Sequence, residues 1–257
     1  MRHINTNTQE WLAMPAAPRN TSPVPELTSL HGTQNRGPWG SASYRGNCDG
    51  YLISKLLRYF DATRVLDPMT GSGTCREVCE DLNIEHLAMD VRHGQDAADP
   101  EQYQGKGHFD FVWMHPPYWR QIVYSADPRC LSNAPTLNAF GKRLQAVLGN
   151  CKRVLAPGGK IAVLIGGYSD RGSYQPLPAV AIQRAEQVGL RMACTEIVRL
   201  QHGNTSSRRT YQSSFIPGLH DQCLIFESVD DGRSPEFSES GSVAPRGRLA
   251  RVAGLSN

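Results

Sequence analysis

Helical and extended hydrophobic patterns alternate along the middle of the chain. Apolar residues recur at helical spacing over residues 52–60, 75–82, 137–155 and 177–188. Short apolar runs typical of buried strands cover residues 64–66, 86–91, 109–114 and 160–165. This alternation predicts an α/β fold with a doubly wound, mostly parallel sheet and right-handed crossovers. Two more strands are predicted near residues 191–200 and 222–227, and since no helix separates them we expect an antiparallel hairpin at one edge.

Capping residues indicate where two of these helices begin and end. Thr136 is placed as the N-cap of the helix that follows it, and Pro157-Gly158-Gly159 should stop that helix. Gly189 is placed as the C-cap of the next helix. A strand over residues 160–165 is therefore expected to follow the first of these helices directly.

The two ends of the chain differ from its middle. Residues 1–43 are rich in Asn, Thr, Pro and Ser, which predicts a flexible segment, or one docked through Trp11 and Trp39. Residues 44–228 form the predicted domain, and residues 229–257 are predicted to be a disordered basic tail. The tail arginines favour solvation, with phosphate binding as the alternative; they are Arg246, Arg248 and Arg251.

Composition narrows the class of protein. A net charge of +3 over 257 residues does not indicate a strongly nucleic-acid-binding surface, so any basic surface must be local. The seven cysteines include no CxxC pair, which favours reduced thiols, a cytoplasmic location and no metal site. Cys75 and Cys79 should face the core. With no long apolar run and no apolar leader, we expect no membrane association.

A Gly-rich turn follows the first strand, in the run from Val65 to Thr74. Gly71 and Gly73 permit a tight strand-to-helix turn in which the backbone approaches a ligand. The turn lacks the Gly-Lys-Ser/Thr ending of a phosphate loop, and its acid Asp67 would repel phosphate but suit an ammonium group. Asp90 ends the next strand, where dinucleotide-binding folds place an acid on ribose hydroxyls.

A second loop, His115-Pro116-Pro117-Tyr118, follows the strand over residues 109–114. Two consecutive prolines fix φ and remove donors, so the carbonyls of His115 and Pro116 are held outward as acceptors. A pair of acceptors at residues 115 and 116 suits an exocyclic amine, whose lone pair is otherwise delocalised into its ring. Tyr118 would stack on the ring that carries the amine, with Trp119 as a second platform.

Together these loops resemble those of the S-adenosylmethionine-dependent DNA amino-methyltransferases that act on adenine or cytosine, over roughly residues 40–228. Their order resembles the bacterial and phage-type branch without an insertion between the loops, as does the stretch Ile122-Val123-Tyr124-Ser125. The resemblance implies a Rossmann-like methyltransferase sheet with S-adenosylmethionine as cofactor. It implies cofactor contacts at Tyr44, Arg45, Gly46, Asn47, Asp67, Pro68, Gly71, Gly73, Thr74, Asp90 and Asp96. Asp96 would accept a hydrogen bond from the adenine amino group of the cofactor, and Asp99 is the alternative for this role.

Residue 115 departs from this family, which usually has Asp, Asn or Ser before Pro-Pro. A neutral imidazole at His115 has one nitrogen that accepts a proton, whereas a protonated imidazole accepts nothing. Activity that depends on His115 should therefore fall as the pH drops through its pKa. The substitution also removes the oxygen that would help to separate adenine from cytosine.

No stretch is long enough for a separate base-reading domain, so nucleic-acid contacts must come from loops. Candidates are Trp119, Arg120, Arg129, Lys142, Arg143, Arg171, Arg208 and Arg209. For the loop that carries Arg208 and Arg209, an ordinary exposed hairpin is an equal alternative. A homodimer or a DNA-reading partner subunit would enlarge this limited surface.

The sequence thus predicts methyl transfer from S-adenosylmethionine to an exocyclic amine of a flipped DNA base, with adenine preferred to cytosine. His115, Pro116, Pro117 and Tyr118 are the predicted catalytic residues. The alternatives are a methyltransferase for RNA or a protein amide, and a non-catalytic regulator that binds DNA or cofactor. Labelled-methyl transfer to DNA, RNA and protein fractions would discriminate among them.

Overall fold

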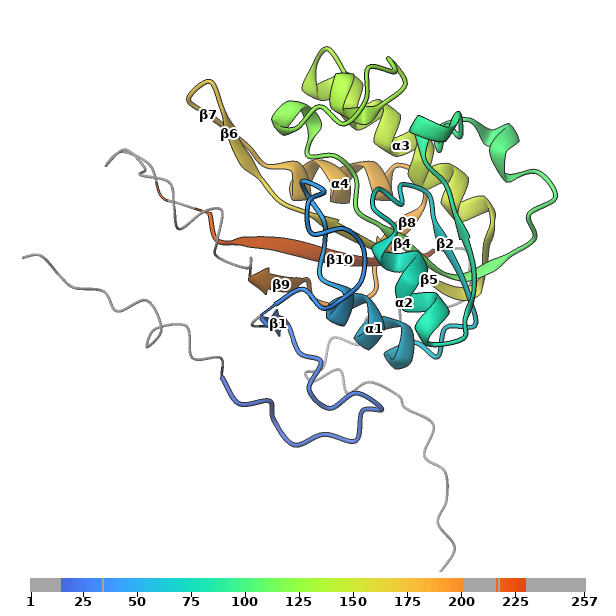
Figure 1. Cartoon of the computed structure of the whole chain (residues 1–257), viewed down its shortest axis with the longest axis vertical. Helices are drawn as coiled ribbons and strands as arrows, with labels where there is room; N and C mark the ends of the chain where they lie inside the picture. Colours follow the sequence, from blue (N-terminus) through green and yellow to red (C-terminus); the bar gives the residue numbers. More distant parts are fainter. Residues whose placement is uncertain (1–14, 34, 201–215, 217, 230–257) are drawn as a thin grey trace, which may run out of the picture.

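The computed structural model describes residues 15–33, 35–200, 216 and 218–229. In this part of the chain no helix is both long enough and apolar enough to cross a membrane. Figure 1 shows a central twisted sheet with helices packed on both faces. The sheet follows the order β3-β2-β4-β5-β10-β9-β1, and β8 also pairs with β10.

The parallel half of the sheet contains four strands and is covered by four helices. The strands are β2 (Arg64–Asp67), β3 (Glu85–Ala88), β4 (Phe109–Met114) and β5 (Leu155–Ile165). The helices are α1 (Gly50–Tyr59), α2 (Thr74–Asp81), α3 (Leu137–Arg153) and α4 (Leu177–Glu186). Every pairing among the four strands is parallel.

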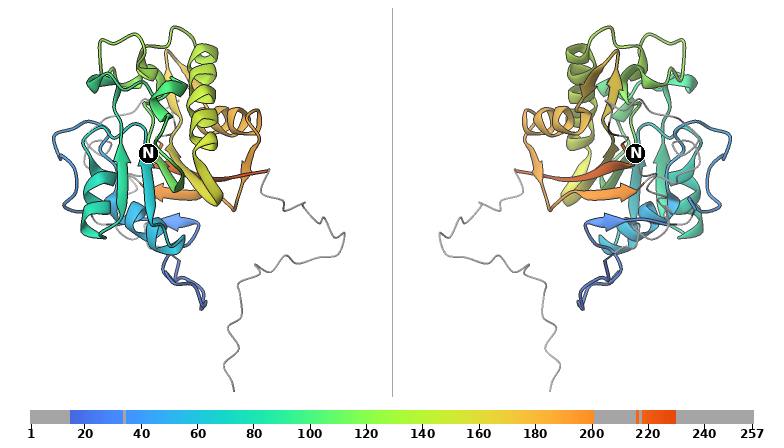
Figure 2. Two further views of the ribbon diagram at one scale, coloured as in Figure 1. Left: turned by 90° about the vertical axis from the view of Figure 1, so that its right-hand side faces the viewer. Right: turned by 90° about the vertical axis from the view of Figure 1, so that its left-hand side faces the viewer.

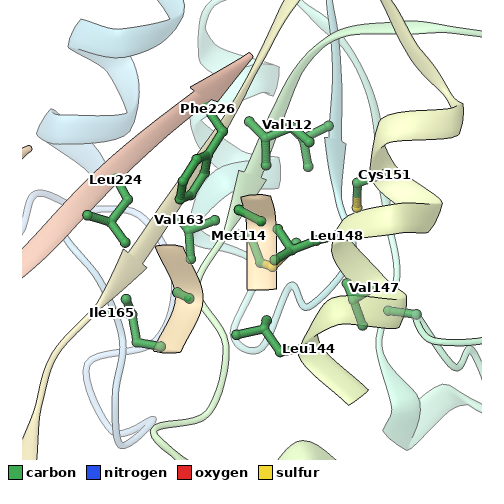
Figure 3. Packing of buried hydrophobic residues seen from close by; sticks show 14 of the residues in the cluster. Val112, Met114, Leu144, Val147, Leu148, Cys151, Val163, Ile165, Leu224 and Phe226 are labelled. Atoms are coloured by element: carbon green, nitrogen blue, oxygen red, sulfur yellow. The ribbon is translucent and has the colours of Figure 1, made fainter. Parts of the chain in front are cut away.

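Alternate residues of the central strands enter two separate cores. On β4, Val112 and Met114 pack in the cluster that contains α3 and α4, which Figure 3 shows from close by. Phe111 and Trp113 point to the other face, into the cluster that contains α1 and α2. A strand that buries both faces reads as a continuous apolar run, as residues 109–114 do. Cys75 and Cys79 are both buried in the second cluster, which confirms that they face the core.

Antiparallel strands complete the sheet. β10 (His220–Ser228) pairs with β5 on one side and with both β8 (Leu190–Met192) and β9 (Ile197–Leu200) on the other. All three pairings are antiparallel. The predicted antiparallel hairpin is therefore present, although the strand expected over residues 191–200 is split into β8 and β9. The mostly parallel, doubly wound Rossmann-like sheet with antiparallel strands at one side agrees with the sequence prediction.

Several predicted boundaries need correction. The helix α3 begins after the Thr136 cap, whose hydroxyl accepts from the Ala139 amide at 3.1 Å. It ends at Arg153, and residues 157–159 lie inside β5 rather than before it, where the register with β4 shifts. β3 ends at Ala88, so Asp90 caps the short 3-10 helix η1 (Val91–His93) instead of ending a strand.

The described part of the N-terminal segment contacts the sheet and two helices. β1 (Leu30–His31) pairs in parallel with β9, and the buried His31 ring lies 2.8 Å from Asp49, the N-cap of α1. The indole NH of Trp39 donates to Asp81 at the end of α2 over 2.5 Å. Trp11 and the tail arginines Arg246, Arg248 and Arg251 lie outside the described residues, and the domain boundaries stay a prediction.

Candidate functional site

A cleft opens at the carboxyl ends of β2 and β4. Its walls come from the turn before α1, the Gly-rich turn after β2, the segment after β3 and the Pro-Pro loop after β4. In parallel sheets these ends are where ligands bind. Predicted site residues that line it are Tyr44, Gly46, Asn47, Asp67, Pro68, Gly71, Thr74, Asp90, Asp96, His115, Pro116 and Pro117. Arg45, Gly73 and Tyr118 do not line it.

The Gly-rich turn approaches the segment before α1 closely. Gly71 has φ +55°, and a Cβ added there would lie 3.2 Å from the Tyr44 ring. Gly73 has φ +87° and caps α2, so it shapes the turn without facing the cleft. The side-chain oxygen of Asn47 accepts from the Ser72 hydroxyl at 3.0 Å and from Thr74. Asn47 therefore fastens the upstream segment onto the Gly-rich turn.

Asp67 is the more deeply buried of the two buried acids that line the cleft. Its carboxylate accepts from the Met69 amide at 3.1 Å, and only 4% of the residue is exposed. Burial raises the pKa of Asp67 to about 7, and the nearby Asp90 acts in the same direction. A cationic group placed in the cleft would favour the ionised form of Asp67 and so offset the effect of burial.

Asp90 already has a cationic partner. Its carboxylate accepts from the Arg92 guanidinium at 2.7 and 2.9 Å and from the Gly71 amide at 3.1 Å. Burial opposes ionisation, but these hydrogen bonds outweigh it and hold the pKa of Asp90 below its usual value. Arg92 also lies over the Tyr44 ring, 5.2 Å from its centre. The sequence prediction missed Arg92; its position two residues after Asp90 was the available signal.

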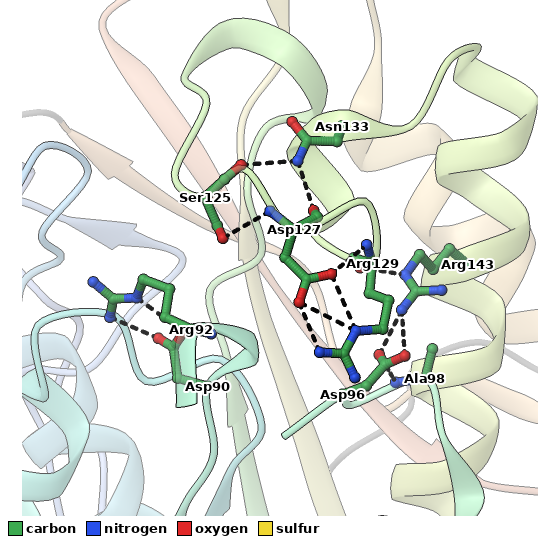
Figure 4. Close-up of polar contacts among 9 residues, drawn as sticks. All are labelled: Asp90, Arg92, Asp96, Ala98, Ser125, Asp127, Arg129, Asn133 and Arg143. Carbon is green, nitrogen blue, oxygen red and sulfur yellow. Dashed lines mark hydrogen bonds and ion pairs between the residues drawn. The ribbon is translucent and has the colours of Figure 1, made fainter. Parts of the chain in front are cut away.

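Asp96 belongs to a chain of ion pairs that Figure 4 shows. Its two oxygens each accept from Arg143 of α3 at 2.5 Å. Arg143 donates onward to the Arg129 carbonyl at 2.6 Å, and Arg129 pairs with Asp127 at 2.7 Å. Arg129 and Arg143 thus line the cleft in intramolecular ion pairs, and their contact with nucleic acid stays a prediction. An adenine bound at Asp96 would share its carboxylate with Arg143.

His115 lies at the start of the Pro-Pro loop and lines the cleft. Burial lowers the pKa of His115 to about 4; Arg199 lowers it too, whereas Asp221 opposes this shift. The imidazole is therefore neutral across the physiological range. Protonation of His115 should therefore reduce activity only as the pH falls toward 4.

The aromatic residues after the prolines are held by the protein. The Tyr118 hydroxyl lies 3.3 Å from Nε2 of His115. Trp119 is buried, its indole NH donates to the Ala134 carbonyl at 2.7 Å, and Arg120 lies 4.2 Å from its ring centre. A stacking platform needs an open ring face, which the buried Trp119 does not offer in this conformation, and its stacking on a base stays a prediction. The sequence prediction gave no role to Tyr124, which stacks on Tyr44 at 5.7 Å beside the cleft.

No protein family and no curated protein sequence matches the chain. Among solved structures, TrmN from Thermus thermophilus has 20% identity and a TM-score of 0.42 over 72% of this chain. The CcbJ methyltransferase from Streptomyces caelestis has 14% identity and a TM-score of 0.42, over 75% of this chain and all of its own. TTHA0409, also from Thermus thermophilus, named as a putative DNA modification methylase and complexed with S-adenosyl-L-methionine, has 22% identity and a TM-score of 0.36 over 52% of this chain.

The chain spans about half the length of TrmN and of TTHA0409. A functional conclusion for this protein therefore has to rest on the residues of its own cleft.

Proposed function

We propose that the cleft binds S-adenosylmethionine and that the protein transfers its methyl group to an exocyclic amine of a DNA base, with adenine preferred to cytosine. The observation that carries this proposal is the meeting, in one cleft, of a buried acid and a Pro-Pro loop preceded by a neutral imidazole. Asp67 supplies the first and His115 the second.

The charges of the cleft favour a ligand that carries an ammonium group. Three acids line it, and Asp90 and Asp96 are paired with Arg92 and Arg143. Among the described residues, no basic side chain pairs with Asp67, which accepts an amide hydrogen bond from Met69. The amino group of the cofactor's methionine part is such a cation, and the crowded Gly71 turn leaves backbone close to a ligand. Asp67 would hold it.

The loop after β4 suits the other reactant. When bound, the cofactor would supply an electrophilic sulfonium methyl group, whose transfer to the amine nitrogen would leave the carbon–sulfur electron pair on sulfur. His115 and the Pro116 carbonyl would accept hydrogen bonds from the two amine protons, and the proton lost passes through His115 to water. Direct transfer of this kind depends on positioning and on exclusion of water.

The hairpin of β6 (Tyr168–Asp170) and β7 (Ser173–Gln175) would contact the DNA. It projects beyond the carboxyl end of β5 in Figure 1, and an ion pair between Arg120 and Asp170 ties it to the segment after the Pro-Pro loop. Arg171 is exposed at its turn and Tyr174 is 63% exposed. Arg208 and Arg209, also predicted as contacts, lie outside the described residues. A second copy or a partner subunit would extend this surface.

Arg171→Ala is expected to weaken binding to duplex DNA of any sequence and to reduce the salt dependence of binding by about one phosphate contact, because Arg171 would pair with the backbone. Fluorescence anisotropy with labelled duplexes at several salt concentrations would measure this. Arg58→Ala, at the end of α1, is the matched control. Equal affinities and salt slopes for the wild type, Arg171→Ala and Arg58→Ala would show that the hairpin does not contact the DNA.

Labelled-methyl transfer from S-adenosylmethionine to duplex DNA, RNA and protein fractions tests the proposed activity. The expected product is methylated DNA, with N6-methyladenine exceeding N4-methylcytosine on hydrolysis. Transfer to RNA or protein alone would replace the proposed substrate, and cofactor binding without any transfer would favour the non-catalytic regulator. Full activity in a His115→Ala, Tyr118→Ala double variant would show that the Pro-Pro loop takes no part in the reaction.

A further inference from the structure

A buried polar cluster lies behind the Pro-Pro loop, on the side away from the Gly-rich turn. It contains His115 and Tyr118 from that loop, Arg199 from β9 and Asp221 from β10. Arg199 and Asp221 are partners in the antiparallel register and form an ion pair with 7% and 2% exposure. Two charges removed from water at this depth need each other, so the pair is a fixed feature of the fold.

Tyr118 links this ion pair to His115. Its hydroxyl lies 3.3 Å from Nε2 of His115, and the Asp221 carboxylate acts on it electrostatically. Gly166 shows how closely the residues meet, because a Cβ added there would lie 2.2 Å from the Asp221 carboxylate and 3.0 Å from the Tyr118 ring. Burial and the adjacent Asp221 carboxylate raise the pKa of Tyr118, so the phenol keeps its proton.

The hydrogen-bonding capacity of each group fixes the direction of the chain. Asp221 is ionised beside Arg199 and can only accept. Tyr118 has a single proton, and the charged Asp221 carboxylate is a stronger acceptor for it than a neutral imidazole, so the phenol oxygen is left to accept. The partner at 3.3 Å must then donate, which places the proton of the neutral His115 ring on Nε2.

We propose that Arg199, Asp221 and Tyr118 are positioning residues that hold His115 as its Nε2–H tautomer and so present Nδ1 to the cleft as the acceptor for the target amine. The last clause rests on the proposed function, whereas the tautomer itself does not. In this arrangement the imidazole replaces the compact oxygen of the related enzymes with a single lone pair of defined position.

Two-dimensional NMR of the full chain with ¹⁵N-labelled histidine, recorded at pH 7, tests the tautomer directly. The His115 signals are assigned by their loss in His115→Asn. The wild type is expected to show the Nε2–H pattern, and Tyr118→Phe, which removes the hydroxyl, is expected to show a mixture of both tautomers. Tyr59→Phe, which changes an exposed tyrosine on α1, is the control and should leave the wild-type pattern.

Turnover provides the second measurement. Tyr118→Phe is expected to lower kcat about tenfold while the cofactor Kd is unchanged. Asp221→Ala alone leaves Arg199 buried without its partner and can unfold the chain. The double variant Arg199→Met, Asp221→Ala is therefore measured beside Tyr118→Phe, and it should also show a mixture of both tautomers. An Nδ1–H pattern in the wild type, or an unchanged pattern in Tyr118→Phe, would overturn the inference. The expected pattern without methylation of any substrate would uphold the tautomer and reject the proposed function.

Discussion

Asp67→Asn is expected to weaken S-adenosylmethionine binding about 100-fold at pH 7.5, as measured by isothermal titration calorimetry. A hydrogen bond to a charged group contributes roughly 1.5–3 kcal/mol, and about 1.4 kcal/mol corresponds to tenfold in Kd. Wild-type affinity should rise as the pH increases from 5.5 to 7.5, because the carboxyl with a pKa of about 7 must lose its proton to meet the ammonium group. The variant should have no such slope.

The same substitution is expected to stabilise the ligand-free protein at pH 8. A carboxyl whose pKa rises on folding from 3.8 to about 7 binds its proton more tightly in the folded state. The stability it contributes below pH 4 is lost as the pH rises through 7, by at most about 4 kcal/mol. Asparagine carries no such penalty, so its Tm at pH 8 should exceed that of the wild type.

Asp61→Asn is the control for both measurements, since Asp61 is exposed at a left-handed position that asparagine tolerates. It should change neither the Tm nor the affinity for the cofactor. A lower Tm at pH 8 together with unchanged affinity in Asp67→Asn would show that Asp67 holds the fold and does not hold a ligand.

The order and type of the main elements were predictable because each buried strand is a continuous apolar run and each helix carries an apolar stripe. The boundaries of these elements were less predictable. Pro157-Gly158-Gly159 indicates a helix end by local propensity, yet pairing with β4 carries the chain through these residues as a bulged strand. The hairpin β6–β7 and the strand β1 are only two or three residues per strand, too short for a periodic pattern.

Which residues line the cleft was predictable where a motif fixes the position, as for Asp67, Gly71 and Pro116. The ionic partners of Asp90 and Asp96 depend on tertiary contacts that no spacing rule reveals. Arg143 lies 47 residues from Asp96, on the face of α3 that turns toward the cleft. Arg199 and Asp221 meet only through the register of β9 with β10. The cluster behind His115 could therefore not be predicted before the pairing of these strands was known.

Replacement of His115 is expected to have the largest effect on turnover. His115→Ala should lower kcat about 100-fold or more, the usual magnitude for a lost proton-accepting side chain. His115→Asn supplies an oxygen acceptor at the same position and should recover much of this loss. Single-turnover rates at saturating cofactor measure the effect, and unchanged cofactor Kd values would separate it from a binding defect.

The pH profile of the wild type distinguishes a buried acceptor from an exposed one. Protonation converts the imidazole from an acceptor into a donor at both nitrogens, so kcat must fall as the pH drops through the pKa of His115. Because burial lowers this pKa to about 4, kcat at saturating cofactor should stay level from pH 8 to about 5.5 and decline only below it. The Asp67 carboxyl does not disturb this window, since a bound ammonium group keeps it ionised. A kcat that is halved near pH 6.5 would mean that His115 is hydrated during the reaction, and that the hydrogen-bonded chain through Tyr118 does not persist in the working enzyme.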